Sequence, residues 1–146
     1  NIEDRLGHFK FFIFYLLSGF LAGIAHVFFN IQSDIPTIGA SGAVAGVLGA
    51  YMVCFPGAKI ATLVPMFPFW ATIRLPAVIV LGFWFVIQFF NGAFSINTQR
   101  GGVAWWAHIG GFIAGIILIW LLPKSRKIRQ HYYIYNHDDD NNNYPL

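Results

Sequence analysis

Residues 35–137 contain no aspartate or glutamate. A soluble domain carries charged side chains on roughly a quarter of its residues, whereas this chain of 146 residues is 10% charged and 57% hydrophobic. A carboxylate-free stretch of that length predicts a membrane protein. The net charge of +3 comes from short clusters of Lys and Arg between apolar stretches. Such clusters favour membrane flanks over a nucleic-acid surface, so the lipid bilayer is an expected partner and nucleic acid is not.

Four apolar segments approach or reach the length that crosses a bilayer core about 30 Å thick. They run over residues 11–29, 38–55, 75–90 and 103–122. The third is short and contains Pro76 and Gln88. Residues 30–37 read as a turn-rich link, residues 56–74 as a link with three prolines and Lys59, and residues 91–102 as a polar Gly/Asn loop. We therefore expect an all-α fold, a polytopic membrane helix bundle over residues 1–122.

The basic residues predict an orientation, because short cytoplasmic loops are enriched in Lys and Arg. Eight of the nine lie before the first segment, in the second link or after the fourth segment, and Arg100 alone falls on the other side. Both visible ends are therefore expected in the cytoplasm, and the second and fourth segments enter from outside. Residues 123–146 are first basic and then polar, which predicts a disordered cytoplasmic tail. We expect a multi-pass protein of a bacterial plasma membrane.

Ser41 lies in the run GASG at residues 39–42, directly after the first link and in the first turn of its segment. The first amides of a helix lack intrahelical partners and the helix dipole is positive there, so an oxyanion beside Ser41 would be stabilised. Gly39 and Gly42 permit close approach of a substrate backbone. Alternatively, these glycines and the small residues that follow only form a packing face for a neighbouring helix.

His108 lies one to two turns inside the outer end of the fourth segment, followed by Gly111 and Gly115 on the same helical face. Those glycines let a second helix pack closely. Because both segments enter from outside, Ser41 and His108 are expected at similar shallow depth and within contact of each other. An apolar setting favours the neutral imidazole, which can act as a general base for serine. Alternatively, His108 is a lone buried histidine satisfied by a backbone carbonyl.

The apolar segments contain no carboxylate, and Cys54 is the single cysteine. A carboxylate proton relay, a di-metal carboxylate site, an aspartyl protease and an intramolecular disulfide are therefore excluded within this chain. We expect no metal and no cofactor. A serine–histidine arrangement has no candidate carboxylate to orient it, so a dyad is the only version available.

Residues 39–43 (GASGA) and 107–115 (AHIGGFIAG) resemble the GxSG and AHxxGxxxG motifs of rhomboid intramembrane serine proteases. The run before residue 10 also resembles that family's approach to its third span, and the resemblance covers roughly residues 1–122. It implies that four helices of a six-helix rhomboid-like core are visible. It further implies that Ser41 is the nucleophile, that His108 is the base, and that the substrates are proteins cleaved in or near a transmembrane segment.

The resemblance also implies that two core spans precede residue 1 and carry an HxxxN pair that helps to bind the oxyanion, so this chain alone is expected to lack that half of the site. His26 and Asn30 repeat the HxxxN spacing, but we expect them to bridge the helix end and the link. Ala45 stands where some members place a tyrosine that stacks on the histidine. That departure leaves open what supports the imidazole.

Two other functions compete with proteolysis. A non-catalytic member of the same fold would bind or escort membrane clients, although such proteins usually lack the serine or the histidine, and this chain has both. A transporter or channel piece would use glycine-rich helix starts to bind ions or solutes, with helices broken at mid-membrane. The oligomeric state does not follow from the sequence.

Overall fold

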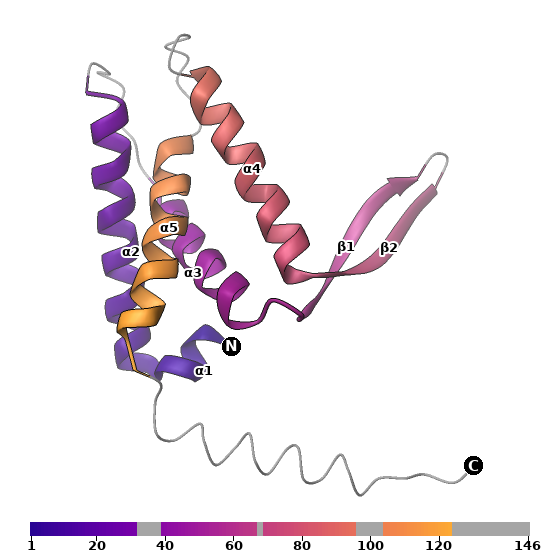
Figure 1. Ribbon diagram of the computed structural model, residues 1–146, viewed down its shortest axis with the longest axis horizontal. Helices are drawn as coiled ribbons and strands as arrows, with labels where there is room; N and C mark the ends of the chain where they lie inside the picture. The colour runs from indigo at the N-terminus through magenta and orange to yellow at the C-terminus, as the bar shows by residue number, and fades with distance from the viewer. Residues whose placement is uncertain (32–38, 67–68, 96–103, 124–146) are drawn as a thin grey trace, which may run out of the picture.

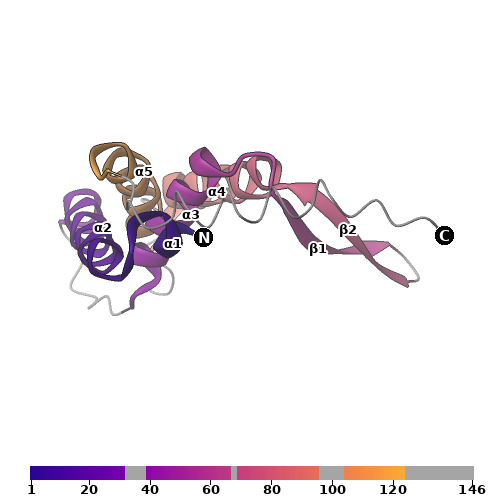
Figure 2. The ribbon, with the colours of Figure 1, turned by 90° about the horizontal axis from the view of Figure 1, so that it is seen from below.

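The computed structural model describes residues 1–31, 39–66, 69–95 and 104–123. Within them are the helices α1 (Ile2–Leu6), α2 (His8–Phe29), α3 (Ser41–Cys54), α4 (Ala77–Ser95) and α5 (Trp105–Leu121), and the strands β1 (Lys59–Met66) and β2 (Phe69–Pro76). Helices α2, α3 and α5 pack together, α4 leans on this group, and the β1–β2 hairpin projects away from it (Figures 1 and 2). The predicted all-α membrane bundle is confirmed, with one hairpin added.

Glycines bring α3 and α5 into backbone contact. A Cβ added at Gly111 would overlap the carbonyl oxygen of Gly42, and one added at Gly115 would overlap the carbonyl oxygen of Gly46. Small residues four positions apart are the feature that lets helix backbones approach this closely in a membrane. Since Ser41 precedes Gly42 and His108 lies one turn before Gly111, this contact sets the position of both side chains.

Helix α2 covers the seam between α3 and α5. A Cβ added at Gly42 would lie 2.6 Å from the Cβ of Ala22, and one added at Gly46 would lie 2.6 Å from the Cβ of Ser18. An added Cβ at Gly110 would overlap Ala25 in the same way. The three helices therefore pack through small residues on every pairwise contact.

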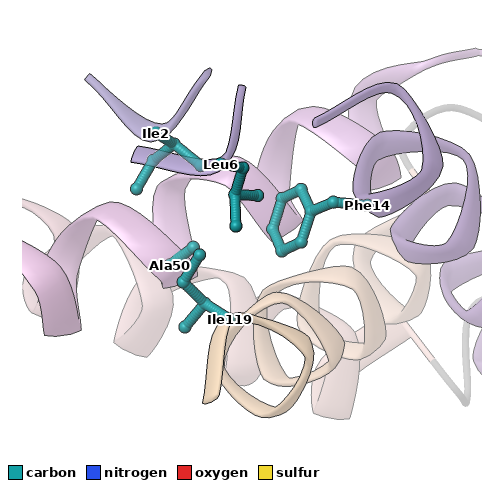
Figure 3. Close-up of a cluster of buried hydrophobic side chains, with 5 residues drawn as sticks. All are labelled: Ile2, Leu6, Phe14, Ala50 and Ile119. Atoms are coloured by element: carbon teal, nitrogen blue, oxygen red, sulfur yellow. The ribbon is translucent and has the colours of Figure 1, made fainter. Parts of the chain in front are cut away.

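A compact apolar cluster closes the end of the bundle that carries α1. Figure 3 shows its members, which come from α1, α2, α3 and α5: Ile2, Leu6, Phe14, Ala50 and Ile119. At the same end, Lys10 Nζ donates a hydrogen bond to the Pro123 carbonyl (3.2 Å). This contact joins the start of α2 to the chain that leaves α5.

The helices differ in length, which places Ser41 below the end of α2. Helices α2 and α4 are long and apolar enough to cross a membrane, whereas α3 has 14 residues and α5 has 17. At 1.5 Å per residue, α3 is about 21 Å long, which is shorter than a 30 Å core. Gly42 packs on Ala22, and α2 continues from there to Phe29, so Ser41 lies about 10 Å below that helix end.

The outward faces of the long helices suit a lipid environment. Phe12 and Phe20 of α2 and Phe83 of α4 are each more than half exposed. Contiguous exposed apolar surface of this kind is unusual on a soluble monomer. The outward faces therefore support the membrane assignment.

The link at residues 56–74 contains regular structure that the sequence did not predict. Strands β1 and β2 occupy most of that segment as an antiparallel hairpin in which Lys59 pairs with Pro76 and Met66 with Phe69. Pro65 and Pro76 lie towards the two ends of the ladder. A hairpin of two strands has only edge strands, where a missing amide is tolerated.

The predicted boundaries of the third segment were wrong, because α4 begins after Pro76 and continues to Ser95. Its first amides are satisfied by the preceding link: Ala77 N donates to the Ala58 carbonyl (2.8 Å) and Val78 N to the Pro56 carbonyl (3.2 Å). At the other end, Asn91 and Gly92 looked like a loop. A Cβ added at Gly92 would lie 3.2 Å from Ile109, so this glycine serves close packing on α5 rather than a turn.

Several predicted segments lie outside the described residues. They are most of the first link (residues 32–38), most of the third link (residues 96–103) and all of the tail after Pro123. The disorder predicted for the tail stays a prediction.

Replacing Gly115 with alanine is expected to destabilise the bundle by about 1–3 kcal/mol, because the new Cβ forces α5 away from the Gly46 carbonyl. Gly23→Ala is the matched control, since a Cβ at Gly23 meets nothing within 4 Å, and its effect is expected within about 0.5 kcal/mol. Thermal or denaturant unfolding in detergent measures both. Equal effects of the two substitutions would contradict the backbone contact between α3 and α5.

Candidate active site

Ser41 is the first residue of α3, and its surroundings leave the helix start open. The N-cap residue is Ala40, which offers no side-chain hydrogen bond to the first amides. The first intrahelical bond runs from Val44 N to the Ala40 carbonyl (3.1 Å). The amide of Ser41 therefore belongs to the set of helix N-terminal donors that intrahelical bonds leave unused.

Gly39 shapes the approach to the Ser41 hydroxyl. Its φ of 153° is a backbone conformation that residues other than glycine rarely adopt. A Cβ added at this position would lie 3.6 Å from Ser41 Oγ. A larger residue would therefore strain the turn and crowd the hydroxyl. Ser41 itself is exposed.

His108 of α5 lies within hydrogen-bond distance of Ser41. Its Nε2 is 3.0 Å from Ser41 Oγ, across 67 positions of sequence. The contact expected from the topology is therefore present, and it joins the first turn of α3 to the first turn of α5. Gly42, Gly111 and Gly115 lie in the interface just below this contact.

The second ring nitrogen of His108 contacts Gln88 of α4. Gln88 Oε1 lies 2.7 Å from His108 Nδ1, and the Gln88 residue is only 5% exposed. With the amide oxygen as acceptor, Nδ1 carries the hydrogen and donates it. Nε2 then presents its lone pair to Ser41, whose hydroxyl donates. Gln88, His108 and Ser41 form a chain of hydrogen-bond contacts across three helices.

Two aromatic rings flank the imidazole. The Trp84 ring lies with its centroid 5.9 Å from that of His108, and the Trp105 ring lies edge-on at 6.4 Å. Trp84 is one helical turn before Gln88, so one face of α4 supplies both contacts. Ala45, which lacks the ring that some rhomboids place there, is buried in a cluster with Leu81 and Phe112. Helix α4 thus supplies the support that α3 does not.

His26 and Asn30 bond locally at the end of α2. Asn30 Nδ2 donates to the His26 carbonyl (3.0 Å) and lies 3.5 Å from His26 Nδ1. The amide therefore closes the last turn of the helix, where carbonyls lack intrahelical donors. This bonding accords with the structural role expected of the pair.

The sequence did not assign Gln88 or Trp84 to the site. Gln88 is the one polar residue of segment 75–90, and it was noted as a polar group within the membrane without a role beside the dyad. The available signal was the cost of a polar side chain in an apolar helix, which marks functional candidates.

In the part of the chain that the structure describes, no group of three or more His, Cys, Asp or Glu side chains could hold a metal ion.

A family model described as the rhomboid domain matches residues 1–125. The chain belongs to the rhomboid family. It is 28% identical over 129 residues to "Rhomboid protein 1, mitochondrial" of Saccharomyces cerevisiae, covering 86% of this chain and 34% of that protein. It is 30% identical over 131 residues to "RHOMBOID-like protein 6, mitochondrial" of Arabidopsis thaliana, covering 86% of this chain and 36% of that protein. No solved structure matches it significantly.

The chain therefore spans about a third of the length of these two curated relatives. Both are mitochondrial by name, which does not support the expectation of a bacterial plasma membrane. Membership of the rhomboid family and the apolar helices support an integral membrane protein.

Ser41→Cys is expected to react with a charged, water-soluble maleimide at least about tenfold faster than Ser18→Cys, because thiol modification requires access. Ser41 is exposed, whereas Ser18 is fully buried between α2 and α3. Both variants carry Cys54→Ala to remove the natural thiol. Equal modification rates in membranes would contradict the access to Ser41 that the structure describes.

Proposed function

We propose that this rhomboid chain carries the catalytic dyad of a serine endopeptidase that cleaves peptide bonds in or near transmembrane segments. The observation that carries the proposal is the 3.0 Å contact between Ser41 Oγ and His108 Nε2. A hydroxyl beside the unprotonated nitrogen of an imidazole, which is itself held by a third group, is the arrangement of an activated serine nucleophile. Ser41 is then the nucleophile and His108 the general base.

The reaction follows from the positions of these atoms. Ser41 Oγ attacks the carbonyl carbon of the scissile bond while its proton passes to His108 Nε2. The proton then moves to the leaving amine as the carbon–nitrogen bond breaks and leaves an acyl-serine. Water then attacks the acyl carbon while His108 Nε2 takes its proton. The proton passes to Ser41 Oγ as the bond between that oxygen and the acyl carbon breaks, which releases the second product and restores the serine.

The start of α3 supports the oxyanion of each tetrahedral intermediate. The backbone amide of Ser41 is one donor, and the positive end of the α3 dipole adds to it. Gly39 leaves room for the substrate backbone beside the hydroxyl. One donor of this kind contributes about 10²- to 10³-fold in rate.

The surroundings of the dyad favour membrane-embedded substrates. Ser41 lies below the end of α2, and α2 and α4 on either side present exposed apolar faces. A substrate segment that is itself apolar can approach along those faces without leaving the lipid. We infer that the Ser41 end of the bundle faces away from the membrane side on which the Lys and Arg residues gather.

A serine-directed fluorophosphonate is expected to label the full-length protein, and Ser41→Ala or His108→Ala is expected to abolish the labelling. The first variant removes the attacking oxygen and the second removes the base, which contributes about 10²- to 10⁴-fold. Gel fluorescence after labelling in membranes measures both.

Matched controls separate this chemistry from loss of the fold. Ser18→Ala removes a hydroxyl buried between α2 and α3, and His8→Ala removes an exposed imidazole that pairs with Glu3. Both are expected to keep wild-type labelling. Labelling that survives Ser41→Ala would eliminate the mechanism, and a folded wild-type protein without labelling or cleavage would favour a role in binding or escorting membrane clients.

We also propose a mitochondrial membrane as the compartment, because both curated relatives are named for that organelle. A tagged full-length protein is expected to fractionate with mitochondrial membranes and to resist carbonate extraction, as a multi-pass protein does. Recovery in a plasma-membrane fraction would contradict the proposed mitochondrial location and would not test the proposed reaction at Ser41.

A further inference from the structure

We propose that Gln88 is the positioning residue of the dyad: its side-chain oxygen holds the hydrogen of His108 on Nδ1, so that Nε2 is free to take the proton of Ser41. The proposal rests on the proposed function. It deepens that function by assigning a polar group on a third helix to the same site.

The geometry restricts what Gln88 can do. Its Oε1 is 2.7 Å from His108 Nδ1, a distance typical of a good hydrogen bond. Gln88 is 5% exposed, so water competes weakly for either atom. Trp84 lies one turn earlier on α4, and its ring centroid is 5.9 Å from the ring centroids of both His108 and Phe112. These ring contacts keep that face of α4 against α5.

The position of α4 is fixed at both ends, which a positioning residue requires. The amides of Ala77 and Val78 bond to carbonyls of the link after α3. Gly92, one turn beyond Gln88, packs close to Ile109 of α5. Gln88 is therefore held between two anchored points rather than on a free helix end.

The chemistry explains why an amide serves here. A neutral imidazole has two tautomers, and only the one protonated at Nδ1 offers a lone pair to Ser41. An acceptor at Nδ1 selects that tautomer, as the aspartate of a catalytic triad does. A buried carboxylate in this apolar setting would cost desolvation energy, whereas the amide oxygen is neutral and cannot itself remove the proton from Nδ1.

Two substitutions distinguish an acceptor from a packing residue. Gln88→Met keeps the shape and loses the acceptor, and Gln88→Glu keeps an acceptor and adds an ionisable group. Fluorophosphonate labelling of the full-length protein is expected to slow by about 10- to 100-fold in the Met variant. The His108 imidazole becomes positively charged when it takes the proton of Ser41, and the hydrogen bond that the Met variant lacks is stronger to a charged group than to a neutral one. The Glu variant is expected to label faster than the Met variant. A packing role predicts the reverse order, since Met suits an apolar site better than Glu.

The tautomer can be observed directly. In ¹⁵N NMR of the full-length protein, with the His108 signals assigned by their loss in His108→Gln, the wild type is expected to show hydrogen on Nδ1. The Met variant is expected to show a mixture or hydrogen on Nε2. Leu81→Ala, which removes a buried α4 side chain that packs in the Phe112 cluster, is the control: it is expected to lower thermal stability and leave the tautomer unchanged.

These readouts separate the two proposals. A wild type that resists labelling defeats the proposed function, while the NMR comparison still tests the hydrogen bond from Gln88. A wild type that labels, together with a Met variant that labels at the same rate and keeps hydrogen on Nδ1, overturns the role of Gln88 alone.

Discussion

The backbone contact between α3 and α5 is the constraint on which the rest of this structure depends. Gly111 and Gly115 lie against the carbonyl oxygens of Gly42 and Gly46, so the two helix backbones are in direct contact. Ser41 and His108 extend from those two helices, and the close backbones bring Ser41 Oγ within 3.0 Å of His108 Nε2. A larger side chain at these glycines would push α3 and α5 apart and so move the Ser41 hydroxyl away from the His108 imidazole.

Stability and chemistry share the same contacts in this bundle. Lipid tails are as apolar as leucine, so helix association in a membrane relies on close packing of small residues and on polar contacts between helices. The glycine interface supplies the close packing between α3 and α5. The hydrogen bond from His108 to Gln88 supplies the polar contact between α5 and α4. Those two helices otherwise pack through aromatic rings such as Phe85 on Phe112. One hydrogen bond therefore joins a third helix to the bundle and orients the imidazole.

The sequence was sufficient for the features that short motifs and bilayer length determine. Segment lengths and the absence of carboxylates indicated a helical membrane bundle, and the direction of the second and fourth segments placed Ser41 and His108 on the same side. Gln88 was not assigned, because its role depends on which face α4 turns to α5, and that register is set by Trp84 and Gly92 in three dimensions. The hairpin was missed because proline breaks central strands but is tolerated in a ladder that has only edges.

The short length of α3 makes the proposed hydrolysis compatible with a lipid environment. A helix of 14 residues that begins about 10 Å below the end of α2 leaves the hydroxyl of Ser41 exposed, whereas Gln88 on the other side of the imidazole is buried. His108 therefore lies at the boundary between an open side, from which water could reach Ser41 in the proposed reaction, and a closed side, where a charged partner would be costly. An uncharged acceptor on the closed side lets the imidazole keep a fixed tautomer without a buried carboxylate, so a neutral glutamine is the group that this position in a membrane favours.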